Sequence, residues 1–252
     1  MGEKTASPAM RFLVLALVLF AADASAQILR PATPIALPSS DDDEPEMVWR
    51  YRPSGGTALP VSGRTSSRVL SGTAWNGLNG GPIYAIEMGE RNDRPCYLKV
   101  FYTRQNAQYR ESEEFEICAG NGPTSSSRRR IGAATPAPGT SRVPALRGLQ
   151  VCSNDRNGSN YRVKGLRVRM GRSHETGSGS VSNNPSGNDD FARSNCRDWE
   201  QLRMCPAGQV IVALDVHYSL GGGQGAITGL APRCAGPVEE EIESPECGPG
   251  HC

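Results

Sequence analysis

This chain of 252 residues lacks most of the patterns that identify an enzyme or a metal protein. It has three histidines, and none of its serines lies in a nucleophile-elbow sequence, so the common arrangements for nucleophilic catalysis are incomplete. None of the eight cysteines forms a C-x-x-C pair, which removes the main support for zinc-ribbon and thioredoxin-like folds. Aromatic residues make up 6% of the chain and few alternate with basic residues, which disfavours nucleic-acid stacking. We therefore expect no metal, no cofactor and no nucleic-acid partner.

Helical periodicity is missing as well. No segment sustains an apolar period of 3.6 residues, and 29 glycines and 19 prolines leave little room for long helices. Apolar and polar residues instead alternate over 97–103, 163–170 and 210–218, which is typical of strands with one buried face. The sequence therefore predicts an all-β fold.

The alternation also predicts which side chains face the core. In the second segment the phase changes at Gly165, which indicates a β-bulge and leaves Arg167 and Arg169 pointing outward. The expected inward residues are Leu98, Val100 and Tyr102, then Leu166, Val168 and Met170, and finally Val210, Val212, Leu214, Val216 and Tyr218. The opposite face of the last segment carries Ile211, Ala213, Asp215 and His217.

Long apolar runs are confined to one place near the N-terminus. Phe12–Ala22 is too short to span a bilayer, follows the basic Arg11, and precedes the small-residue sequence Ala24-Ser25-Ala26. We expect residues 1–26 to be a signal peptide and the mature chain to be soluble, with no transmembrane segment. An even number of cysteines in an exported chain favours disulfides, so we expect a secreted, periplasmic or extracellular protein.

The rest of the chain divides by composition. Residues 27–65 are rich in Pro, Ser and Gly and predict a flexible lead-in, 66–237 carry the strand patterns of a single domain, and 238–252 form an acidic tail. Within the domain, 177–190 is rich in Ser, Gly and Asn and predicts an exposed loop. The sequence ALRGLQVC at 145–152 is similar to AITGLAPRC at 226–234, and 113–118 is a weaker third copy. Repeated strand-pair units predict a β-prism or a β-sandwich.

The unit at 195–237 has the most recognisable pattern. Trp199 precedes Cys205-Pro206-x-Gly208, and after an alternating strand comes Ala226-Ile-Thr-Gly229-Leu-x-x-x-Cys234. This pattern resembles one repeat of the vitelline membrane outer layer protein I family. The resemblance implies a β-prism of three Greek-key sheets, a Cys205–Cys234 disulfide and, where a ligand is known, a carbohydrate. The chain departs from the family at Gly223-Gln224-Gly225, where the family has an acidic pair, and its earlier units lack the Trp and Cys-Pro elements.

Spacing alone does not determine the disulfides, because eight cysteines allow about 105 pairings. A Cys205–Cys234 bond would tie the entry of a strand pair to its exit, and Cys96–Cys118 follows the same logic. We regard these two bonds as the best-supported pairings, and we also expect a disulfide between Cys247 and Cys252 that closes a small terminal loop.

Positive charge gathers in the middle of the chain, although the formal net charge is +1. The stretch 128–172 holds eleven basic residues and a single acid. On a β surface, Arg162, Lys164, Arg167 and Arg169 would form a compact basic patch, and arginine suits carboxylate, sulfate and phosphate groups. Neutralisation of this patch by the acidic ends of the chain and by the acidic stretch 111–116 is the alternative.

Trp75 and Trp199 are candidates for stacking on a sugar ring. Together with the basic patch they favour a non-catalytic, lectin-like protein whose partner is a carbohydrate, such as an acidic polysaccharide or a glycolipid. A structural coat protein without a ligand site is one alternative. A polysaccharide-active enzyme is another, with His217 as a base and Asp215 to orient it. None of these patterns sets the oligomeric state.

Overall fold

The computed structural model describes residues 46–52, 55–72, 81–104, 109–120, 122–137, 142–174, 188–221 and 224–242. The elements whose bounds lie within these ranges are β-strands, apart from the short 3-10 helix Ser125–Ser127. The all-β prediction is therefore confirmed. The expected signal peptide, Trp75, Cys247 and Cys252 lie outside the described residues.

Most strands belong to three sheets, each built on a long antiparallel hairpin. The first sheet contains β5 (Ile83–Arg91), β6 (Arg94–Arg104), β7 (Tyr109–Glu116) and β8 (Arg128–Gly132), in the order β7-β6-β5-β8. The second contains β9 (Arg142–Ser153), β10 (Val163–His174), β11 (Asn188–Ala192), β12 (Asp198–Trp199) and β13 (Arg203–Met204). Its order is β11-β10-β9-β12, with β13 also on β9.

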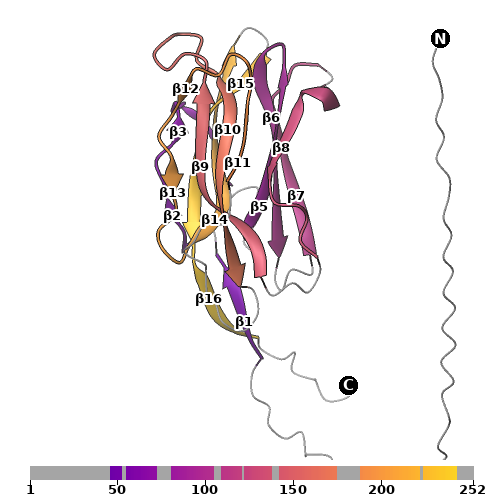
Figure 1. Cartoon of the computed structure of the whole chain (residues 1–252), viewed down its shortest axis with the longest axis vertical. Helices are drawn as coiled ribbons and strands as arrows, with labels where there is room; N and C mark the ends of the chain where they lie inside the picture. Colours follow the sequence, from indigo (N-terminus) through magenta and orange to yellow (C-terminus); the bar gives the residue numbers. More distant parts are fainter. Residues whose placement is uncertain are drawn as a thin grey trace, which may run out of the picture. The chain divides into compact units, whose positions relative to one another are not determined.

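The third sheet contains β2 (Thr57–Ala58), β3 (Ser62–Gly63), β4 (Arg68–Leu70), β14 (Val210–Gly221) and β15 (Gln224–Ala235). Its order is β2-β15-β14-β4, with β3 also on β15. In Figure 1 the first sheet stands at the right of the view, beside the strands of the other two sheets.

The inward faces of all three sheets meet in one apolar core. Each sheet contributes fully buried side chains to it, among them Ile86, Leu98, Leu149, Leu166, Leu214 and Leu230. Burying one such side chain contributes about 1.5–3 kcal/mol relative to leaving it exposed, so the shared core dominates the stability of the fold. Three sheets around one core form a β-prism, one of the two architectures that the repeats predict.

The predicted core faces of β6 and β10 are confirmed. Their inward residues all belong to the core, namely Leu98, Val100, Tyr102, Leu166, Val168 and Met170. A register shift between Val163 and Gly165 confirms the predicted bulge in β10.

In β14 the predicted faces are wrong in the first half of the strand. A register shift between Ile211 and Ala213 shows a bulge, which adds one residue to β14. The residues that precede the bulge therefore lie on the opposite faces from those predicted. Ile211 therefore lies in the main core, whereas Val210 and Val212 pack with Tyr51 in a separate apolar cluster.

The β structure extends beyond the predicted domain limits of 66 and 237. In the expected lead-in, β2 and β3 pair with β15. A separate ribbon forms where β1 (Glu46–Tyr51) pairs with β16 (Pro237–Ile242), which includes the start of the expected acidic tail. The sequence of 27–65 did not predict β2 and β3, because a strand of two residues is too short to show an alternation of apolar and polar residues.

The two similar sequences occupy equivalent places in the fold. They lie in β9 and β15, and each of these strands pairs with one long strand and with two strands of two residues. Cys152 lies opposite Trp199 of β12, and Cys234 lies opposite Thr57 of β2. The weaker copy at 113–118 begins in β7, which pairs with β6 at the sheet edge, so it does not share this place.

Disulfides join Cys96 to Cys118, Cys205 to Cys234, and Cys152 to Cys196. The first two are the pairs that the sequence favours. The third, which the sequence left open, ties β9 to the segment that leads into β12.

Replacing Cys152 and Cys196 by alanine should lower the free energy of unfolding by about 2–4 kcal/mol, because the bond closes a long loop in the unfolded chain. The two cysteines are 44 residues apart, against 22 for Cys96 and Cys118, whose removal should therefore have the smaller effect. Chemical denaturation followed by circular dichroism measures both. Equal stability of the Cys152→Ala/Cys196→Ala variant and the parent chain would contradict this expectation.

Candidate functional site

The basic patch predicted on β10 is divided by the bulge. Lys164 is the extra residue of the bulge and is 0% exposed, so it does not lie on the surface. Arg162 precedes the strand and pairs with Asp93, with 3.6 Å between Nη1 and Oδ2. Arg167 and Arg169 lie beyond the bulge and remain half-buried on the outward side. The prediction of one compact patch is therefore wrong, because the bulge sends its members to two different places.

Lys164 lies in a charged junction between the first and second sheets. Its ammonium contacts Oδ1 of Asp93 and is 3.7 Å from Oε2 of Glu90. Arg193 pairs with the other oxygen of Glu90 at 3.0 Å, and the amide of Asn195 donates to both carboxylate oxygens of Asp93. A buried lysine needs such partners because an unpaired charge in the interior is strongly destabilising. The junction holds the β5–β6 turn against β10.

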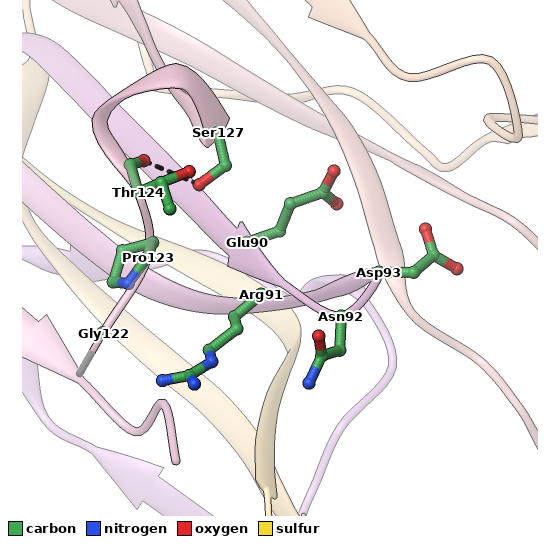
Figure 2. Close-up of a pocket in the computed structure, with 8 residues that line it drawn as sticks. All are labelled: Glu90, Arg91, Asn92, Asp93, Gly122, Pro123, Thr124 and Ser127. Atoms are coloured by element: carbon green, nitrogen blue, oxygen red, sulfur yellow. Dashed lines mark hydrogen bonds between the residues drawn. The ribbon is translucent and has the colours of Figure 1, made fainter. Parts of the chain in front are cut away.

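A cavity of about 550 Å³ opens beside this turn (Figure 2). Asn92 (φ 50°) and Asp93 (φ 60°) have the left-handed backbone of a two-residue hairpin turn, which Asn and Asp accept readily. Figure 2 shows Glu90 and Asp93 extending to one side of the turn and Arg91 and Asn92 to the other. Both carboxylates are already paired with cations of the second sheet. We therefore interpret this cavity as part of the junction and not as a catalytic site.

The predicted Asp215–His217 pair does not form. Asp215 is 9% exposed and pairs with Arg233, with 3.0 Å from Nε to Oδ1 and 2.8 Å from Nη2 to Oδ2. Its Oδ1 also accepts the backbone N–H of Gly72 at 2.7 Å. His217 has a different partner, because its Nδ1 accepts the backbone N–H of Ser66 at 3.1 Å. The hypothesis that Asp215 orients His217 is therefore wrong.

On the outward face of the second sheet, Arg167 meets Trp199 and two polar neighbours. In the strand register Arg167 lies opposite Asp190 of β11 and Gln150 of β9. Its Nε and Nη2 are both 3.0 Å from Oδ2 of Asp190, and its Nη1 is 3.5 Å from Oε1 of Gln150. The guanidinium carbon lies 4.1 Å from the centre of the Trp199 ring. We call these four residues the Arg–Trp platform.

Local structure holds the platform in place. Trp199 lies opposite Cys152, whose disulfide to Cys196 anchors the approach to β12. The amide of Gln150 donates to the backbone oxygen of Glu200 at 2.6 Å. Arg167 is therefore fixed by residues of β9, β11 and β12, and the platform is pre-organised for binding.

The sequence identified only part of the platform. Arg167 and Trp199 are predicted site residues, and Arg169 lies two residues beyond Arg167 on the same strand. Asp190 stands at the end of a segment predicted as a loop, although β11 begins at Asn188, and nothing in the sequence singled out Gln150. Only the strand register brings these two side chains to Arg167.

In the described ranges, no group of His, Cys, Asp and Glu is arranged to hold a metal ion. Over those same residues, none of the helices has the length and apolar character needed to cross a bilayer. The three disulfides indicate that the chain folds in an oxidising environment.

No protein-family model matches the sequence, and comparison with curated proteins finds no relative. Among solved structures, the Calystegia sepium agglutinin is 10% identical, over 72% of this chain and 97% of its own, with a TM-score of 0.40. A mannose-binding lectin from champedak is 11% identical, over 71% and 96%, with a TM-score of 0.42. A mannose-specific jacalin-related lectin from Morus nigra is 10% identical, over 71% and 94%, with a TM-score of 0.40. Likeness at this level carries no conclusion about ligands or binding residues of this chain.

Acid should weaken the junction around Lys164. Burial acts to raise the pKa of Asp93, but hydrogen bonds from Lys164 and Asn195 and the charges of Lys164 and Arg162 hold it below the ordinary value of 3.8. The contribution of Asp93 to stability is therefore complete above that ordinary pKa and is lost as the pH falls through the lower folded-state pKa. Lys164 is buried but Asp93 is half exposed, so solvent screening reduces the cost of breaking this pair. Asp93→Asn should therefore lower the free energy of unfolding at neutral pH by about 1–2 kcal/mol, and the fall of that free energy in acid should become less steep.

Urea denaturation at a series of pH values measures this effect. The matched control is Asp190→Asn. The two carboxylates are similarly exposed, 51% for Asp190 and 54% for Asp93, and each pairs with a cation. Arg167, the partner of Asp190, is partly exposed, so the control should change stability by less than about 1 kcal/mol. If both variants lost the same stability, Lys164 would not depend on Asp93 as described.

Proposed function

We propose that this chain is an exported, non-catalytic protein that binds a carbohydrate at the Arg–Trp platform. The observation that carries the proposal is the stacking of Arg167 on Trp199 at 4.1 Å, with Asp190 and Gln150 bonded to the same guanidinium. Asp215 and His217, the candidates for catalysis, have separate partners, so the enzyme alternative loses its proposed pair.

A sugar presents two kinds of surface to a protein. Its C–H groups pack against an aromatic ring, and its hydroxyls form hydrogen bonds with planar polar groups. The platform supplies the part of the half-buried Trp199 indole that Arg167 leaves uncovered, the carboxylate of Asp190 as an acceptor, and the amide of Gln150. Because these groups are already held by one another and by strand pairing, little conformational freedom would be lost on binding.

The charge around the platform favours an acidic carbohydrate. Arg169 follows Arg167 on the outward side of β10, and among the described residues no carboxylate lies within ion-pair distance of it. Arginine binds carboxylate and sulfate groups through parallel hydrogen bonds. The carbohydrate class is therefore proposed to carry such groups.

Trp199→Ala should weaken binding of the preferred glycan about 10-fold, because loss of an aromatic contact of about 1–1.5 kcal/mol corresponds to that factor. The parent chain, with its disulfides intact, is first tested on a glycan array at low and high salt. Affinities of the parent and variant for the best glycan are then measured by calorimetry.

Phe101→Ala is the matched control, because it removes a stack of the same kind from the first sheet, where Arg130 lies 4.2 Å from the Phe101 ring centre. This variant should bind as the parent does. Binding at low salt that is lost at high salt would support an acidic ligand. An array without bound glycans at either salt concentration would refute the proposal and favour the structural-coat alternative.

A further inference from the structure

A second cavity, lined in part by Glu200, the residue that follows Trp199, has a volume of about 400 Å³. Its lining comes from the links β2–β3 and β3–β4, the turn between β9 and β10, the link between β12 and β13, and the adjoining ends of β3 and β13. The residues that matter here are Gly63, Arg64, Arg156, Tyr161, Glu200 and Arg203. We call this cavity the arginine pocket.

Positive charge in the arginine pocket exceeds negative charge. Arg156 pairs with Glu200, with 3.0 Å between Nε and Oε2. Arg64 and Arg203 have no carboxylate within ion-pair distance among the described residues. Two guanidinium groups therefore remain without a neutralising partner beside the pocket.

These two guanidinium groups are nevertheless held in place. Arg64 donates to the backbone oxygens of Gly158 and Arg156, both at 3.0 Å. Arg203 donates to the backbone oxygen of Val61 from Nε at 3.2 Å and from Nη2 at 3.0 Å. Neutral acceptors fix the position of a guanidinium without cancelling its charge, which is the arrangement an anion site needs.

Tyr161 gives a second and independent indication of a ligand. It is 7% exposed and lines the pocket, and its hydroxyl lies near Ser153 and Glu200 without a hydrogen bond of ordinary length to a described residue. Buried polar groups are nearly always well paired, so a hydroxyl without a hydrogen bond of ordinary length in a pocket wall can donate to an acceptor that enters the pocket. Burial and the charge of Glu200 raise the pKa of Tyr161, so the hydroxyl keeps its proton and can donate.

Gly63 leaves room at this hydroxyl. Its φ of 108° is accessible to glycine and strained for other residues. A Cβ at this position would lie 3.1 Å from the hydroxyl oxygen of Tyr161 and 2.6 Å from the backbone oxygen of Thr228. A side chain here would therefore crowd the hydroxyl that glycine leaves clear.

The geometry points to the arginine pocket as a binding site for an acidic substituent of a sugar, a carboxylate or a sulfate, whose neighbouring sugar lies on the Arg–Trp platform. This inference rests on the proposed function and assigns charge recognition to residues other than those of the platform. The two places are joined by Arg156, which donates from Nη2 to the backbone oxygen of Trp199 at 3.0 Å. The cavity volume falls in the range of small-ligand pockets.

Calorimetric titration of the full chain with three probes tests this assignment. The probes are a galacturonic acid oligosaccharide, a sulfated dextran oligosaccharide and a neutral dextran oligosaccharide of similar length. Arg203→Gln should weaken the tighter acidic probe about 10-fold, as expected for loss of a charged hydrogen bond, and Tyr161→Phe should weaken it about 5-fold. Any binding of the neutral probe should stay within about 2-fold of the parent for both variants.

Arg129→Gln is the matched control, because Arg129 also bonds to backbone oxygens, those of Ser126 and Arg128. It removes the same charge from the first sheet and should change acidic binding by less than about 2-fold. Tyr161→Phe keeps the test independent of folding, since it deletes one hydroxyl that has no hydrogen bond of ordinary length and leaves the Val61 contacts of Arg203 intact.

A stronger response to galacturonate assigns the pocket to carboxylates, and a stronger response to sulfated dextran assigns it to sulfates. If Arg203→Gln and Tyr161→Phe changed acidic binding no more than Arg129→Gln, the pocket assignment would be overturned. In that case a loss of binding on Trp199→Ala would leave the proposed function standing. Failure of the parent chain to bind any glycan or probe would overturn both.

Discussion

The rest of the structure depends on the burial of three sheet faces in one apolar core. Leu149 of β9 and Leu166 of β10 are buried in this core. Because side chains alternate along a strand, the next residues, Gln150 and Arg167, point outward. Because each sheet has one buried face, its polar chemistry is confined to the outer face and to the strand ends. The Arg–Trp platform lies on such a face, and the arginine pocket lies where four connecting segments meet.

The bulge at Lys164 shows how one residue changes the use of a surface. Without it, Lys164 would alternate with its neighbours on the outside of β10. With it, the ammonium is buried against Asp93 and Glu90 and fastens the first sheet to the second. The basic residues that form one patch in the sequence are therefore divided between two places in the fold. Lys164 and Arg162 belong to the junction, whereas Arg167 and Arg169 lie on the solvent side of β10.

The alternation of apolar and polar residues, together with the positions of glycine and proline, predicts the all-β fold, the inward residues of β6 and β10, and the bulge at Gly165. It does so because a period of two reports directly which face of a strand is buried. Periodicity does not report which residues become neighbours across strands, so the meeting of Arg167 with Asp190 and Gln150 could not be predicted. The arginine pocket was hidden for the same reason, since Arg64, Arg156 and Arg203 come from segments that only the closed fold brings together. In β14 a second bulge, without a glycine to mark it, reversed the predicted faces of the first half of the strand.

The most direct test of carbohydrate recognition is an NMR titration of the folded chain that follows the indole N–H signal of Trp199. The signal is assigned by its loss in Trp199→Phe, and a glycan that binds is added until saturation. This signal should move in step with the calorimetric binding curve, because the ligand lies against the Trp199 ring. A saturating glycan that leaves the Trp199 signal unmoved would contradict the account, since binding would then occur elsewhere on the chain.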